Sequence, residues 1–248
     1  MTEIRNRKER LHDEVNMSKD RTLASNGITE GVIWKQLLLF FFPIVLGTFF
    51  QQLYNTADAI IVGKFVGKEA LAAVGGTTGT LINLLVGFFV GLSSGASVII
   101  SQFYGARKAD DVSRAVHTTM ALALASGALL TVLGILFSEQ VLWMMGTPAE
   151  VMEYAVTYIR IYFLGMIPSL IYNIGSGILR AVGDSRRPLF FLISATMTNI
   201  VLDVVLVLGL NMGVAGAALA TVLSQVVSAV LVMFTLCRSP QVYRVQLK

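Results

Sequence analysis

The sequence predicts an all-α membrane protein with six transmembrane helices. Hydrophobic residues make up 55% of the 248 residues and charged residues only 14%, a composition that a water-soluble domain of this size could hardly bury. Six apolar runs each reach the roughly 20 residues that a helix needs to cross the hydrocarbon. They occupy roughly residues 34–62, 71–101, 115–137, 156–179, 189–210 and 214–236.

The basic residues predict the orientation of these spans. Sixteen of the 19 Lys and Arg residues lie before or at the start of the first span, in the second and fourth connections, or after the last span. The other three are Lys64, Lys68 and Arg160. The positive-inside rule therefore places both termini in the cytoplasm, which agrees with an even number of spans. We expect a multi-pass protein of the cell membrane, divided into a charged cytoplasmic tail (1–33), a transmembrane lobe (34–237) and a basic cytoplasmic end (238–248).

Small residues recur every four positions in two spans. The second span has Gly87, Gly91 and Gly95 in this register, and the sixth repeats small residues from Gly216 to Ser228. Because residues four apart share a helix face, such stripes let two helices approach closely within lipid. We expect both stripes to be helix-packing surfaces.

Two acidic residues, Asp58 and Asp203, lie within apolar spans. An Asp at the centre of a transmembrane helix costs about 2.5 to 3.5 kcal/mol on the insertion scale, so a retained acid calls for an interior partner or a cation. Other polar residues share their helix faces and are expected to point into the bundle with them. These residues are Thr48, Gln51 and Asn55 in the first span and Thr196 and Asn199 in the fifth.

Two carboxylates with neutral oxygen donors such as Asn199 and Thr221 suit a hard monovalent cation, and the same pair can share and release protons. The alternative is that Asp58 and Asp203 only form hydrogen bonds to neighbouring helices. Arg160, near the outer end of the fourth span, could pair with one of these carboxylates or extend to the membrane interface.

The sequence does not predict an enzyme or a bound cofactor. It has no GxxxxGK[ST] phosphate loop. Its two histidines, His12 and His117, are too few and too far apart to suggest a metal site, and neither is placed within the bundle, where a Ser-His-Asp triad would need one. Basic patches interleaved with aromatic residues are absent, so no nucleic-acid partner is expected.

Four segments together resemble the multidrug and toxic compound extrusion (MATE) family of transporters. They are Pro43–Gly47, Asp58–Gly63, Gly177–Asp184 with Pro188, and Asn199–Asp203. The resemblance covers residues 34–240 and implies a cation-coupled antiporter, in which inward movement of Na⁺ or H⁺ drives export of amphipathic, often cationic, compounds.

The resemblance also implies roles for residues of this chain. Asp58 and Asp203 would bind the ion or proton, and Asn199 and Thr221 would complete the shell. Family members have two six-helix lobes, so this chain resembles the amino-terminal lobe, and residues 238–248 resemble the start of the linker between lobes. A truncated transporter that lacks its carboxy-terminal lobe is the first interpretation, and a homodimer of half-size chains is the second.

Two further functions compete with drug export. A lipid-linked saccharide flippase of the wider superfamily would use a similar fold with a more cationic cleft, whereas the spans here contain acids and almost no Lys or Arg. A membrane scaffold would use the polar stripes only to bind partner helices. The expected partners are therefore a small amphipathic or cationic compound, membrane lipid and the missing lobe.

Overall fold

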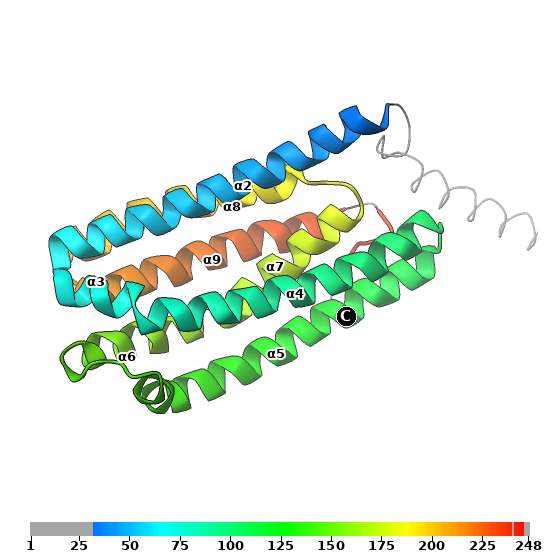
Figure 1. The fold of residues 1–248 in the computed structure, drawn as a ribbon. Coiled ribbons are helices and arrows are strands. Elements are labelled where there is room, and N and C mark those ends of the chain that lie inside the picture. Colours follow the sequence, from blue (N-terminus) through cyan, green and yellow to red (C-terminus); the bar gives the residue numbers. More distant parts are fainter. Residues whose placement is uncertain (1–31, 240, 246–248) are drawn as a thin grey trace, which may run out of the picture.

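The computed structural model describes residues 32–239 and 241–245, and this part of the chain contains helices and no strands (Figure 1). The α-helices are α2 (Ile33–Ile61), α3 (Lys68–Gly75), α4 (Thr77–Gly105), α5 (Ala109–Met144), α6 (Ala149–Leu164), α7 (Met166–Ala181), α8 (Arg186–Asp203) and α9 (Gly213–Arg238). Two π-helical stretches, η1 (Val62–Val66) and η2 (Val204–Gly209), continue α2 and α8. The predicted tail lies, apart from its last two residues, outside the described residues.

The predicted class, an all-α membrane protein, is confirmed. Five helices of the described chain, some of them including a flanking short helix, are long and apolar enough to cross a membrane. The pair α6 and α7 passes the same criteria together and makes a sixth span if it is counted as one. The pair is bent by 53°, so the fourth span is broken and is not the single straight helix 156–179 that the sequence predicts.

The break between α6 and α7 has a local cause. Pro168 has no N–H to donate to the carbonyl of Leu164, so the α-helical ladder stops there and Gly165 forms the joint. The hydroxyl of Thr131 on α5 donates to the carbonyl of Phe163 at 3.0 Å, which satisfies one of the last carbonyls of α6. Gly165 and Pro168 indicate this break in the sequence. The prediction of one helix over 156–179 followed the continuous apolar run and did not use these two residues.

Helix α2 lies at one edge of the bundle. Helix α8 lies between α2 and α9, α9 packs against α6 and α7, and α4 packs against α5 and α7 (Figure 1). The start of α2 and the end of α9 lie at the same end of the bundle and line one cavity there. We call this the α2-start end.

The two small-residue stripes behave differently. Gly216, Ala220, Ser224 and Ser228 of α9 are all buried, as the packing prediction requires. Gly87, Gly91 and Gly95 of α4 are exposed, and a side chain built on any of them would meet no described atom within 4 Å. The packing prediction for the second span is therefore wrong within the described residues.

Helix α4 instead contacts α7 through serines. Ser93 is buried, and its hydroxyl donates to the carbonyl of Asn173 at 2.8 Å. We expect Ser93→Ala to lower the free energy of unfolding by about 1 kcal/mol because one interhelical hydrogen bond is lost. Ser101→Ala is the control, since the Ser101 hydroxyl is exposed and bonds only within its own helix. Thermal unfolding of the purified variants measures both, and equal midpoints would contradict the prediction.

Candidate cation site

The two intramembrane acids lie where α2 and α8 change to π-helices. Asp58 is in the last turn of α2, and Asp203 is the last residue of α8. The π-helical hydrogen bonds follow at once, from Gly67 N–H to Val62 O at 3.1 Å and from Leu210 N–H to Val205 O at 2.9 Å. Such stretches are rare and occur often at functional sites. Because η1 and η2 contact each other and α9, the two acids come to the same level of the bundle.

The four predicted site residues are all buried. The exposed fractions are 6% for Asp58, 0% for Asn199, 0% for Asp203 and 2% for Thr221. Asp58 and Asp203 are close enough to interact electrostatically. Three spans thus contribute polar side chains to the interior, as the polar stripe on the fifth span predicts for Asn199 and Asp203.

Several polar atoms in this region have no hydrogen-bond partner among the described residues. They are Oδ1 of Asp58, both carboxylate oxygens of Asp203, the amide oxygen and nitrogen of Asn199 and the hydroxyls of Thr196 and Thr221. Unpaired buried polar groups are costly, and buried carboxylates especially so. The group is thus rich in oxygen atoms available to a small cation or to protons.

Neither acid has a basic partner in the described chain. The ion pairs found there join other carboxylates, Arg160 with Glu139 at 3.5 Å and Arg187 with Asp184 at 3.1 Å. Arg160 also donates to the hydroxyl of Ser138 at 3.1 Å. Of the two options for Arg160, pairing with an intramembrane acid is therefore wrong, because α5 supplies its partners.

The polar stripe predicted on the first span is only partly correct. Thr48, Gln51 and Asn55 are exposed, and Asn55 donates to Gln52 on its own helix at 3.3 Å. Because α2 packs along a narrow side against α8, with Pro43 and Gly47 buried there, most of its circumference stays uncovered. Asp58 is the one member of this stripe that is buried.

Tyrosines that the sequence patterns did not indicate lie near Asp58. Tyr54 on α2 and Tyr158 on α6 both interact with Asp58 and lie close to Thr221, and Tyr162 lies close to Gln225 on α9. The rings of Tyr158 and Tyr162 stack with their centroids 6.4 Å apart. The spacing of four residues between Tyr54 and Asp58, and between the two α6 tyrosines, could have indicated a shared face.

A group of three or more His, Cys, Asp or Glu side chains that could hold a metal ion does not occur in the part of the chain that the structure describes. With two carboxylates, an amide and hydroxyls, the donor set is hard and carries at most two negative charges. Such a set fits Na⁺ or protons better than a transition metal, which prefers imidazole or thiolate.

Comparison with known proteins identifies the family. The family model MatE matches residues 43–205. The chain is 34% identical over 205 residues to "Probable multidrug resistance protein YoeA" of Bacillus subtilis, covering 81% of this chain and 44% of that protein. It is 23% identical to "Multidrug export protein MepA" of Staphylococcus aureus, covering 87% of this chain and 48% of that protein.

Solved structures agree with the sequence matches. A multidrug resistance MATE family transporter of the MOP superfamily in its outward-facing conformation superposes with a TM-score of 0.82 at 30% identity, covering 89% of this chain and 49% of that one. A MOP superfamily transporter from Pyrococcus furiosus, described as having a binding pocket of reversed polarity that suggests a different function, gives a TM-score of 0.78 at 31% identity, with 85% of this chain and 46% of that one covered. The chain spans about half the length of the relatives it matches. It is a multi-pass membrane protein that belongs to the MatE family of transporters.

Proposed function

We propose that the chain forms the amino-terminal lobe of a cation-coupled antiporter in the cell membrane, with both termini in the cytoplasm. In this proposal Asp58, Asn199, Asp203 and Thr221 hold the coupling ion, and transport, not catalysis, is the activity. The observation that carries the proposal is the pair of buried carboxylates, of which Oδ1 of Asp58 and both oxygens of Asp203 lack partners in the described chain.

The physical argument is the balance of buried charge. Two carboxylates close together and away from Lys and Arg repel each other and have lost their hydration. A bound Na⁺ or a shared proton offsets both penalties. Release of that ion restores the unfavourable state, so the site is suited to bind and release an ion as the lobe changes conformation.

The proposed substrates are amphipathic or cationic compounds, moved in the direction opposite to the ion. Acids within the spans favour cationic compounds, and several relatives have names that describe multidrug resistance or export. Since the chain spans about half of each relative, a second lobe is the proposed partner that completes the substrate cleft.

The proposal is tested first on ion binding. The chain is purified in neutral detergent, and its thermal unfolding is followed in NaCl and in choline chloride of equal ionic strength, at pH values from 5 to 9. An ion that binds only the folded state raises the midpoint by mass action, so we expect a rise with Na⁺ or, for proton coupling, a strong pH dependence. A chain that responds to neither would contradict cation coupling and favour the scaffold.

A flippase for a lipid-linked saccharide is the second candidate. The Pyrococcus furiosus transporter is described as having a binding pocket of reversed polarity. In this chain, Arg180 on α7 is a half-buried cation with no ion pair among the described residues. Binding of a lipid-linked pyrophosphate that is lost in Arg180→Gln would favour this function. Binding of a cationic dye that survives this substitution would favour drug export.

A further inference from the structure

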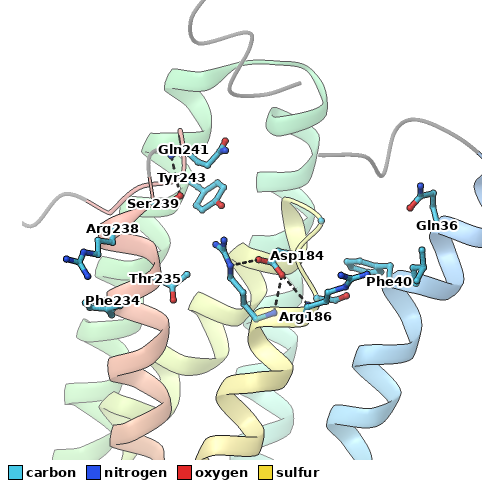
Figure 2. Close-up of a pocket in the computed structure, with 14 residues that line it drawn as sticks. Gln36, Phe40, Asp184, Arg186, Phe234, Thr235, Arg238, Ser239, Gln241 and Tyr243 are labelled. Carbon is cyan, nitrogen blue, oxygen red and sulfur yellow. Dashed lines mark hydrogen bonds and ion pairs between the residues drawn. The ribbon is translucent and has the colours of Figure 1, made fainter. Parts of the chain in front are cut away.

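A cavity of about 710 Å³ lies at the α2-start end of the bundle (Figure 2). It is bounded by the first turns of α2, by the connection between α7 and α8, and by the end of α9 with the residues that follow it. None of the four proposed ion-binding residues lines it.

The connection between α7 and α8 forms one wall of this cavity. Gly183 turns the chain in the left-handed region with φ of 91°. Oδ1 of Asp184 accepts hydrogen bonds from the backbone N–H of Arg186 at 3.2 Å and of Arg187 at 3.1 Å, so it caps the start of α8. Oδ2 of Asp184 pairs with Nε of Arg187 at 3.1 Å. The wall is therefore held in place by its own hydrogen bonds.

The cavity carries an excess of positive charge. Among the described residues, Arg186, Arg187 and Arg238 line it together with a single carboxylate, Asp184, which pairs with Arg187. The side chains of Arg186 and Arg238 form no ion pair within residues 32–239 and 241–245, and Arg238 lies over the ring of Phe234 at 4.9 Å. Two guanidinium groups are thus available to an anion, and guanidinium is the group best suited to bind phosphate oxygens.

Polarity changes with depth along the same cavity. On α2, Leu39 and Phe40 lie one turn further into the bundle than Gln36, and on α9 Phe234 lies one turn further in than Arg238. Leu39 and Phe234 are exposed, with about half of each side chain uncovered. The cavity therefore presents cations at its outer end and uncovered apolar side chains further in, the arrangement expected where lipid headgroups meet acyl chains.

We propose that this cavity binds an anionic phospholipid, with Arg186 and Arg238 on the phosphate and with Leu39, Phe40 and Phe234 along the first part of an acyl chain. A free phosphate would use only the cationic end, so the apolar wall favours the lipid as the source of the anion. The proposal depends on the geometry of this end of the bundle and not on the proposed ion site.

The test is native mass spectrometry of the full chain in neutral detergent, with phosphatidylglycerol and phosphatidylcholine added at equal concentration. We expect phosphatidylglycerol to bind about tenfold or more tightly, and Arg186→Gln with Arg238→Gln to remove this preference. Arg114→Gln is the matched control, because Arg114 is an exposed arginine near the start of α5 and does not line the cavity. Equal preference in the wild type and the double variant would overturn the proposal.

Two further arms separate a lipid site from a phosphate site and from misfolding. Inorganic phosphate at millimolar concentration should leave phosphatidylglycerol bound, and its complete displacement would overturn the lipid assignment. Arg238→Lys keeps the charge but loses the planar guanidinium fork, so it should retain part of the preference, and it reports on the site even if Arg238→Gln folds poorly. Loss of the preference in Arg114→Gln as well as in the double variant would mean that general surface charge causes it, which also overturns the site.

Discussion

Replacing Asp203 by Asn should weaken binding of the coupling cation by at least about 100-fold, the largest effect that we expect of any substitution in this chain. Asp203 is fully buried, and neither of its carboxylate oxygens has a partner among the described residues. Asn has nearly the same shape, so the helix can keep its packing while the site loses a full negative charge. Asp58→Asn should act in the same direction through the other half of the pair.

In the cation-free protein, Asp203→Asn should not lower stability. Without a bound ion, Asp58 and Asp203 repel each other, so Asp203→Asn should leave the unfolding midpoint in choline chloride unchanged or raise it. In NaCl the wild type gains stability by mass action and the variant does not. If the coupling ion is a proton, the variant should instead show a flatter dependence of the midpoint on pH.

The matched control is Glu139→Gln, which also removes one acid. Glu139 is exposed and pairs with Arg160 at the surface, so its loss should change stability by less than about 1 kcal/mol and leave the ion response intact. An Asp203→Asn protein with the wild-type response to both Na⁺ and pH would contradict the assigned site. If Glu139→Gln responds to Na⁺ and pH as the wild type does, then a loss of response in Asp203→Asn is due to the site and not to the change in net charge.

Gly134→Ala should lower the free energy of unfolding by about 3 kcal/mol, towards the upper end of the range for overpacking. Gly134 on α5 lies so close to Phe163 that an added methyl group would overlap the phenyl ring. The ring is buried and cannot swing aside as an exposed side chain would. One turn away, Thr131 donates to the carbonyl of Phe163, so α5 also holds the backbone there.

The measurement is thermal or denaturant unfolding of the purified variants against Gly91→Ala. Gly91 is exposed on α4 with no described atom near its missing side chain, so alanine there should be neutral or slightly stabilising. Phe163→Leu should relieve the overlap, and the double variant Gly134→Ala with Phe163→Leu should be more stable than the sum of the single effects predicts. Equal midpoints for Gly134→Ala and Gly91→Ala would contradict the close approach of α5 and α6.

The sequence by itself determined the class, the approximate number of spans and the burial of part of the proposed site. A long apolar run can satisfy its backbone in lipid only as a helix, so composition and run length were enough to predict a multi-spanning helical protein. Burial of Thr196, Asn199 and Asp203 followed from their spacing on one helix face and from the cost of exposing a carboxylate to lipid. These arguments are local, and they need no knowledge of which helices are neighbours.

Only the tertiary structure decided which helix faces are covered and which side chains meet. Thr48 and Asn55 have the same helical spacing as Asp58, but α2 is covered on one narrow side, so they remain exposed. Gly91 has the spacing of a packing residue, yet no helix in the described chain covers it. Arg160 pairs with Glu139, and Tyr158 reaches Asp58, because of contacts between helices far apart in sequence. The periodicity of a single helix gives the direction of a side chain, and only packing between helices gives its partner.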